Sequence, residues 1–320
     1  MLKMARIFFV IAAVFLSACE QQAFLLAPAS ESHSSSITWN NKVDILWVID
    51  NTPSMAQHQT VLAQKSGAFL NGLLSRNLDF RIAATTVDMR SGGTEGKFIG
   101  SPAVLTKSTP NIAAAFNQKI TVAEAAYDLE QGLGGMKRAL ELRSSTNTGF
   151  FRSDALLVVI VVTNEDDGSP GNPSDYISFL DTIKPRTPIG ERNWVFHMIG
   201  VTGAAGENCS TYGNYTEPGY RYMQLVDNSG GAKTTICTGD FSAALAGVEK
   251  RIYDTASRFY LDRVPDVSSI EVLINGNKIP NDPVNGWTYI AADNSIQLHG
   301  NAIARTDVKI DIFYQPIGTK

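Results

Sequence analysis

The chain of 320 residues has little of what several common function classes require. It contains four histidines and three cysteines, without a C-x-x-C or H-E-x-x-H pair, which argues against a zinc site. Lys and Arg number 27 against 31 Asp and Glu, and no basic stripe is present, so nucleic-acid binding is not expected. The G-x-S-x-G nucleophile motif is also missing, and we expect no enzymatic activity.

The N-terminal apolar run, Ile7–Leu16, is shorter than the ~20 residues of a membrane span. Lys3 and Arg6 precede it, and small residues lead from it to Cys19. This pattern predicts a signal peptide over residues 1–18 that is cleaved before a lipidated cysteine. An ordinary signal peptide followed by an incidental cysteine is the alternative.

Residues 19–39 have no periodic apolar face. We expect them to be a flexible tether that holds the folded part away from a membrane. The lipidation pattern resembles that of bacterial lipoproteins, in whose enterobacterial members an Asp after the cysteine marks inner-membrane retention. Glu20 stands at that place here, so the resemblance implies an outer-membrane location.

The two remaining cysteines are Cys209 and Cys237. An exported protein meets oxidising conditions, and we expect this pair to form a disulfide, with two unpaired thiols as the alternative. The loop before and between them, residues 203–220, is rich in tyrosine. Such residues are enriched at interfaces, but they equally suit a loop that packs on its own domain.

Apolar strand patterns and helical patterns alternate from about residue 40 to residue 260. This alternation predicts an α/β fold with a doubly wound, mainly parallel sheet. It includes a short edge strand expected at 97–105 and a long helix expected at 122–142. After residue 260, short alternating segments separated by turn signals predict a small antiparallel β unit over residues 261–320.

The segment VDILWVIDNTPSM, residues 43–55, combines an apolar strand with polar residues at alternate positions. Asp50, Thr52 and Ser54 can converge on one point because residues two apart in an extended loop point the same way. One carboxylate and two hydroxyls are hard oxygen ligands for Mg²⁺, or for Mn²⁺ or Ca²⁺ in its place. The alternative is a plain strand-to-helix connection in which Asp50 or Ser54 is the N-cap.

A second polar loop, TNEDDG, follows the strand expected at 155–162. In doubly wound sheets ligands bind at the carboxyl ends of the strands, so we expect Asn164 to lie near Asp50. This proximity favours the metal site over the N-cap. Asp166 is a further candidate ligand, although a solvated acidic loop that caps the next helix fits the same residues.

Residues 40–260 resemble a von Willebrand factor A domain, the fold of integrin I domains. Asp50, Thr52 and Ser54 match the D-x-S-x-S motif of its metal-ion-dependent adhesion site, with Thr in place of the first Ser. Asn164 occupies the place of the family's second-shell carboxylate. The resemblance implies a divalent cation that binds an acidic side chain of a protein or peptide ligand.

Two departures from the family pattern affect the same site. The family has a Thr in a middle loop, where this chain has AYDLE, so Asp128 or Glu130 is the candidate substitute. Asn164 in place of Asp removes one negative charge. Either the charge is redistributed, or the site is weak, or the domain binds partners without metal.

These observations favour a membrane-tethered lipoprotein of the cell envelope that recognises a protein ligand through a metal. The alternative is a structural or assembly factor of the envelope whose altered domain works without metal.

Overall fold

The structure, a computed structural model, describes residues 33–39, 41–75, 78–122, 129–186, 192–209, 217–238, 240, 242–303 and 308–317. The expected signal peptide, Cys19 and most of the expected tether therefore lie outside the described residues. Within the described ranges, no helix combines the length and the apolar character that crossing a bilayer requires.

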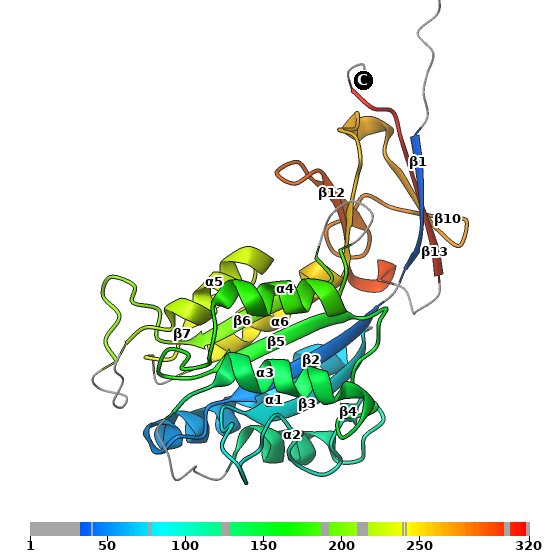
Figure 1. The fold of residues 1–320 in the computed structure, drawn as a ribbon. Helices are drawn as coiled ribbons and strands as arrows, with labels where there is room; N and C mark the ends of the chain where they lie inside the picture. The colour runs from blue at the N-terminus through cyan, green and yellow to red at the C-terminus, as the bar shows by residue number, and fades with distance from the viewer. Residues whose placement is uncertain are drawn as a thin grey trace, which may run out of the picture. The chain divides into compact units, whose positions relative to one another are not determined.

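A six-stranded sheet forms the centre of the α/β domain (Figure 1). Its strands lie in the order β4-β3-β2-β5-β6-β7, and all neighbours run parallel except β3 and β4. The strands are β2 (Lys42–Ile49), β3 (Asp79–Thr86), β4 (Leu105–Thr106), β5 (Leu156–Val162), β6 (Trp194–Gly200) and β7 (Lys233–Thr235). Strands are added on both sides of β2, which confirms the predicted doubly wound, mainly parallel sheet.

Helices cover both faces of this sheet (Figure 1). The inner strands are almost continuous apolar runs, and such strands need cover on both sides. One face packs against α1 (Ala56–Ser75), α2 (Ile112–Ile120) and α6 (Ser242–Ala256). The other face packs against α3 (Gly132–Glu141), α4 (Pro173–Ile183) and α5 (Tyr220–Ser229).

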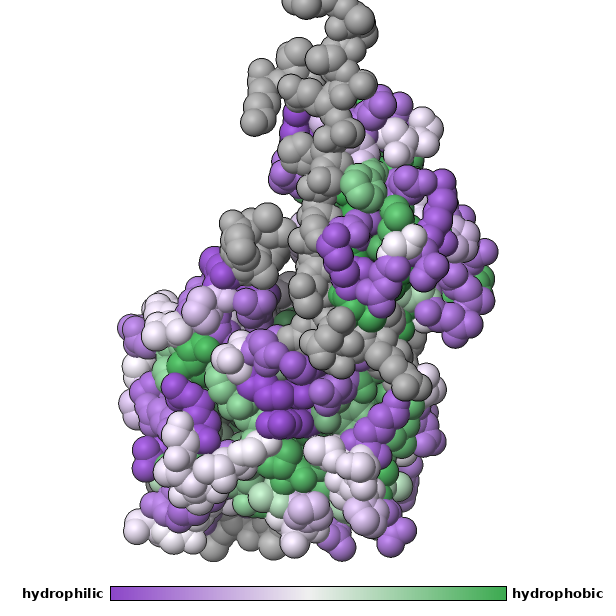
Figure 2. Space-filling view, turned by 90° about the vertical axis from the view of Figure 1, so that its right-hand side faces the viewer, coloured by the Kyte–Doolittle hydropathy of each residue, from purple (hydrophilic) through white to green (hydrophobic). Residues whose placement is uncertain are grey.

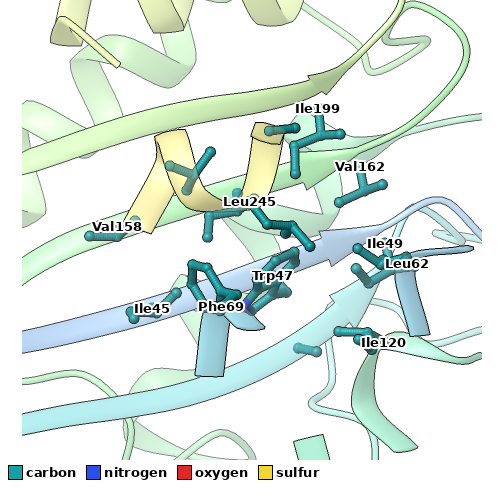
Figure 3. Packing of buried hydrophobic residues seen from close by; sticks show 14 of the residues in the cluster. Ile45, Trp47, Ile49, Leu62, Phe69, Ile120, Val158, Val162, Ile199 and Leu245 are labelled. Carbon is teal, nitrogen blue, oxygen red and sulfur yellow. The ribbon is translucent and has the colours of Figure 1, made fainter. Parts of the chain in front are cut away.

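Trp47 of β2 is the centre of the core on the α1 side (Figure 3). Its ring meets Phe69 of α1 edge to face, with ring centroids 5.2 Å apart, and Phe116 of α2 at 5.6 Å. Leu46, the preceding residue, belongs to the core on the opposite face, as strand alternation requires. The aromatic contacts hold α1 and α2 against the strand that ends at Asp50.

Two antiparallel sheets form a β unit, most of whose strands follow the α/β domain in sequence. One sheet has the order β1-β13-β9-β10 and the other the order β11-β12-β8. The strands are β1 (His33–Trp39), β8 (Arg258–Tyr260), β9 (Glu271–Ile274), β10 (Asn277–Ile279), β11 (Trp287–Ile290), β12 (Ser295–Leu298) and β13 (Val308–Tyr314). Figure 2 shows mainly hydrophilic residues, with smaller hydrophobic areas between them, on one face of this unit.

The expected tether over 19–39 is wrong at its C-terminal end. Residues 33–39 form β1, which pairs antiparallel with β13 over seven residue pairs, from His33 with Tyr314 to Trp39 with Val308. Sequence periodicity missed this strand because β1 lies at the edge of its sheet, where the partner strand supplies the order. The β unit is therefore built from both ends of the chain, and the α/β domain lies between them in sequence.

The long helix expected over 122–142 is also wrong, since residues 129–131 are not helical and α3 begins at Gly132. Close packing on the sheet explains the glycines in this helix. A Cβ at Gly135 would lie 2.7 Å from the main-chain oxygen of Thr86, and one at Gly132 would lie 2.3 Å from the Tyr222 hydroxyl. These glycines allow α3 to approach β3 and α5.

The edge strand expected at 97–105 is reduced to β4, Leu105–Thr106. In the segment before β4, two main-chain carbonyl groups are hydrogen-bonded to the buried Lys119 of α2 and not to a strand. Its ammonium group donates hydrogen bonds to the oxygens of Ile99 (2.7 Å) and Ala103 (2.8 Å). Because main-chain groups must be satisfied when buried, this side chain replaces a strand partner, and burial lowers its pKa to about 8.

A buried ion pair fixes the amino end of β2. The main-chain nitrogen of Arg152 donates to Asp44 Oδ2 at 2.6 Å, and Arg152 Nε donates to Asp44 Oδ1 at 2.8 Å. Arg152 also pairs with Asp79 at the start of β3. Burial raises the pKa of Asp44 even though the Arg152 guanidinium opposes the shift. The segment before β5 is thus attached to the starts of β2 and β3.

His197 of β6 is fully buried, and its Nδ1 accepts a hydrogen bond from Ala232 N at 3.0 Å. Burial is the main cause that lowers its pKa to about 3, against an ordinary value of 6.5. Between these two values only the unfolded chain binds the proton. The free energy of unfolding therefore decreases as the pH falls from 6.5 towards 3.

We expect this group to reduce the free energy of unfolding by about 1.4 kcal/mol per pH unit below 6.5. In the variant His197→Asn, whose amide oxygen can still accept from Ala232 N, the pH dependence should weaken by that amount. Urea unfolding at pH 7, 6, 5 and 4 measures both slopes. A His197 ring that titrates near pH 6.5 in NMR spectra of the folded protein would contradict the prediction.

Candidate metal site

Asp50 directly follows β2, at the edge where the parallel strands end. Its main-chain nitrogen donates to Val162 O of β5 at 2.9 Å, which continues the parallel pairing by one residue. Its main-chain oxygen accepts from Gln59 Nε2 of α1 at 2.9 Å. The same Gln59 accepts from Val122 N at 3.2 Å. The backbone of Asp50 is therefore held by the neighbouring strand and by the first turns of α1.

Four side-chain oxygens form a hydrogen-bonded row beyond the strand ends. Thr52 Oγ1 donates to Asp50 Oδ1 at 2.7 Å, and Thr52 Oγ1 and Ser54 Oγ lie 3.1 Å apart. Ser54 Oγ then donates to Asn164 Oδ1 at 3.2 Å. Asp50, Thr52 and Asn164 are buried, whereas Ser54 is half-buried. The structure thus brings together the four residues that the sequence placed at this edge, and Ser54 is on the accessible side.

Neutral groups alone contact the Asp50 carboxylate among the described residues. Besides Thr52, whose nitrogen also donates at 2.9 Å, Thr163 Oγ1 donates to Oδ2 at 2.7 Å. Burial raises the pKa of Asp50, and the hydrogen bonds from Thr52, Thr163 and the Asn164 backbone oppose the shift. A buried carboxylate that lacks a cationic partner is costly. A hard divalent cation would remove that cost, and carboxylate, hydroxyl and amide oxygens suit such an ion.

Thr163 and Gln59 are contributors that the sequence argument left out. Thr163 follows β5 as Asp50 follows β2, and the pairing of Ile49 with Val162 places them side by side. That signal was present in the sequence, because both strands were expected to end at these residues. Gln59 contacts the Asp50 main chain because α1 folds back beside β2, and no sequence pattern indicates that contact.

Two carboxylates of the acidic loop after β5 are hydrogen-bonded to the N-termini of helices. Asp166 Oδ1 accepts from Arg221 N in the first turn of α5 at 2.9 Å. Asp167 Oδ1 accepts from Leu133 N in the first turn of α3 at 3.0 Å, and Asp167 Oδ2 accepts from Arg221 Nε at 3.1 Å. Carboxylates are favourable at these positions because helix N-termini carry partial positive charge. The expected solvated loop that caps the next helix, α4, is therefore wrong: Asp167 is buried, and the helices whose N-termini these acids contact are α3 and α5.

Glu130 is buried and lies beside the same loop, since its main-chain oxygen accepts from Gly168 N at 2.6 Å. Its alternative, Asp128, lies outside the described residues. Burial raises the pKa of Asp166, and the nearby Glu217 and Asp167 act in the same direction. Both candidate carboxylates are thus partly or wholly withdrawn from solvent at the strand ends.

Cys209 and Cys237 form a disulfide, with Cα atoms 4.6 Å apart. It joins the loop after β6 to the segment after β7, next to a hollow of about 600 Å³. Glu207 beside it accepts hydrogen bonds from Thr202 N and Gly203 N, so this carboxylate organises the loop.

The tyrosines of this region separate into two kinds. Tyr222 is fully buried and packs against Phe196 with ring centroids 6.3 Å apart, so it belongs to the core. Tyr220, at the first position of α5, is 56% exposed. Tyr212 and Tyr215 lie outside the described residues.

No family model matches this chain, and no curated protein matches it either. Among solved structures, the pilus adhesin SpaC from Lactobacillus rhamnosus GG shares 12% identity over 90% of this chain and 42% of its own, with a TM-score of 0.41. The ArnB paralog VWA2 from Sulfolobus acidocaldarius shares 11% identity over 90% of this chain and 63% of its own, with a TM-score of 0.32. The pilus adhesin RrgA from Streptococcus pneumoniae shares 10% identity over 88% and 58%, with a TM-score of 0.33.

The chain spans less than two thirds of the length of each of these proteins. These TM-scores are too low for the activity or ligands of those proteins to apply to this chain. The fold class rests on the observed strand order and on the helices that cover both faces of the sheet.

We expect a divalent cation to stabilise this protein through Asp50. Millimolar Mg²⁺ or Mn²⁺, at about a hundredfold its dissociation constant, adds about 2.7 kcal/mol to the free energy of unfolding and roughly 5–10 °C to Tm. Asp50→Asn should lose this increment and should be at least as stable as the wild type in EDTA. Thermal unfolding with Mg²⁺, Mn²⁺ or EDTA measures the effect.

Asp44→Asn is the matched control, because Asp44 is a buried carboxylate on the same strand but is paired with Arg152. It should lose about 3 kcal/mol of stability and keep the metal increment. An equal metal response in wild type and Asp50→Asn would contradict the assignment.

The capping contact of Asp166 leads to a separate expectation. Asp166→Asn should lower the free energy of unfolding by about 1 kcal/mol through the weakened cap. It should leave the dissociation constant for Mn²⁺ within about threefold of the wild type, as titration calorimetry can measure. A loss of a hundredfold or more would make Asp166 a direct ligand.

Proposed function

We propose that the α/β domain is a recognition module that binds Mg²⁺, or Mn²⁺ or Ca²⁺ in its place, and through it a carboxylate of a protein or peptide ligand. Asp50, Thr52, Ser54 and Asn164 are the residues proposed to hold the ion. The observation that supports this most directly is the buried Asp50 carboxylate, whose described partners are hydroxyl and amide groups. Carboxylate recognition of this kind would serve adhesion.

The charge of the site agrees with an acidic ligand. Asp50 supplies one negative charge, and Thr52, Ser54 and Asn164 are neutral. The bound ion supplies a net positive charge at the strand ends that attracts a carboxylate. Thr163 and Gln59 orient Asp50 by their hydrogen bonds, and the half-buried Ser54 is where a ligand would approach.

Glu130 and Asp166 are assigned supporting positions in this proposal. Metal ligands are commonly oriented by an outer set of polar groups. The Asp166 contact to α5 and the Glu130 contact to Gly168 fix the loop that carries Asn164. Through bridging water, the Glu130 carboxylate could balance the charge that Asn164 lacks.

We further propose that the chain is an exported lipoprotein, anchored through lipidated Cys19 to the outer membrane. The disulfide between Cys209 and Cys237 supports this location, because structural disulfides are typical of oxidising compartments. Cys19 precedes the first residue of β1, His33, by fourteen positions.

A metal-independent assembly factor of the cell envelope is the second candidate. It is favoured by the engagement of Asp166 and Asp167 at helix termini and by Asn164 in place of an acid. In that case the α/β domain would bind its partner through neutral hydrogen bonds, and EDTA would have no effect.

The carboxylate step can be tested with Mn²⁺ as a probe of bound water. Protein-bound Mn²⁺ increases the relaxation rate of water protons, and a ligand carboxylate that replaces a bound water lowers that rate. We expect glutarate to lower it and the neutral glutaramide to leave it unchanged. Asp50→Ala should remove the protein-bound Mn²⁺ signal, and Asp44→Asn should retain it.

The natural ligand can then be sought on immobilised protein. Envelope extract is applied in Mg²⁺ and eluted with EDTA, beside a matched column of Asp50→Asn protein. A partner that elutes with EDTA from the wild-type column alone supports metal-dependent recognition. A partner that stays on both columns in EDTA would show that the assembly factor is the better description.

A further inference from the structure

The end of the β unit next to the start of β1 is closed by a short antiparallel ribbon. Pro265 and Pro316 are bridge partners. On either side of them, Asp266 N donates to Gln315 O at 2.6 Å and Ile317 N donates to Val264 O at 2.9 Å. Val264 and Ile317 are therefore direct cross-strand neighbours, and their side chains lie on the same face of the ribbon.

The ribbon and the elements connected to it, the 3-10 turn and the end of β13, expose four apolar side chains. Val264 is 50% exposed and Ile317 is 60% exposed. Val267, in a short 3-10 turn that contacts β13, is 46% exposed, and Phe313 of β13 is 37% exposed. Single exposed apolar residues are ordinary, but grouped ones mark contact surfaces. We call these four residues the end patch.

The first residue of β1 lies beside the strand that leads to Ile317. His33, the first residue of β1, pairs with Tyr314, and Ile317 follows three residues after that partner. Asp50 lies at the opposite end of β2, which follows β1 after two residues. The connection to Cys19 therefore starts at the end of β1 that pairs three residues before Ile317, whereas the candidate metal site follows the far end of the next strand.

We propose that the end patch rests on the lipid bilayer in which Cys19 is anchored. This proposal rests on the lipoprotein part of the proposed function and is independent of the metal. Residues 20–32 lie between Cys19 and His33, so the start of β1 stays within about 50 Å of the anchor. A connection of this length holds an attached surface at roughly millimolar effective concentration.

That proximity is what a small apolar patch needs to bind. Four partly exposed side chains offer only a few kcal/mol of apolar transfer energy, too little to bring an unanchored protein to a membrane. The charges nearby are mixed, since Arg263 is accompanied by Asp262 and Asp266. The contact is therefore expected to be hydrophobic, insensitive to salt, and present with zwitterionic lipids as well as anionic ones.

The experiment places a polarity-sensitive fluorophore on the patch of the lipidated full chain. Val264→Cys supplies the only thiol, because Cys19 carries the lipid and Cys209 and Cys237 are bonded to each other. Val284→Cys is the matched control: Val284 is 67% exposed in the β unit, in the connection between β10 and β11. Both proteins are reconstituted into phosphatidylcholine vesicles with and without spin-labelled lipid.

We expect a blue-shifted emission at position 264, quenched at least twofold by spin-labelled lipid and unchanged in 0.5 M salt, and neither effect at position 284. Equal emission and quenching at both positions would overturn the proposal. A blue shift that follows protein concentration in lipid-free detergent would also overturn it, because a second copy would then cover the patch.

Failure of the two proposals can be told apart. A mass spectrum of the exported protein without lipid on Cys19 removes the premise of the bilayer contact and overturns it. The Mn²⁺ relaxation experiment uses unanchored protein, so its outcome depends on the metal site alone.

Discussion

The parallel pairing of β2 with β5 is the constraint on which the candidate site depends. Its register continues past the last strand residues, because Asp50 N donates to Val162 O at 2.9 Å. That single bond places the Asp50 carboxylate beside Thr163 and Asn164, two residues more than a hundred positions away in sequence. Because the Asp50 carboxylate is buried, its negative charge must be stabilised by these neighbouring groups and not by water. A shift of one residue in this register would direct Thr163 to the other face and separate the oxygens.

The acidic loop after β5 shows how a fold can use negative charge in its scaffold, without a metal ion. Asp166 and Asp167 lie at the N-termini of α5 and α3, and Arg221 contacts both of them. Two helices and the loop are thereby held together next to Asn164. Asp166 and Asp167 therefore bond to helix N-termini and to Arg221, whereas the Asp50 carboxylate bonds to the neutral Thr52 and Thr163. The charge of the site is thus simple, and it is set by one buried residue.

Periodicity in the sequence was sufficient to predict the sheet, because its inner strands are continuous apolar runs with helical patterns between them. The grouping of Asp50, Thr52, Ser54 and Asn164 followed from the rule that strand ends meet at one edge. Other features depend on partners that no local pattern records. β1 needs β13, the segment before β4 needs the ammonium group of Lys119, and α3 starts where glycines allow close approach. The caps formed by Asp166 and Asp167 likewise become visible only when distant helices are in place.

The position of β1 also determines how the molecule would bear mechanical load. The chain runs from β1 through two residues into β2 and reaches Asp50 at the end of that strand. Tension between the N-terminal segment and the candidate metal site would follow this one stretch of backbone. β1 is bonded to β13 over seven pairs, and β2 is bonded to β3 and β5 on both sides. Because this backbone is already extended, its covalent bonds carry the force, and neither the ladders nor the covering helices have to yield.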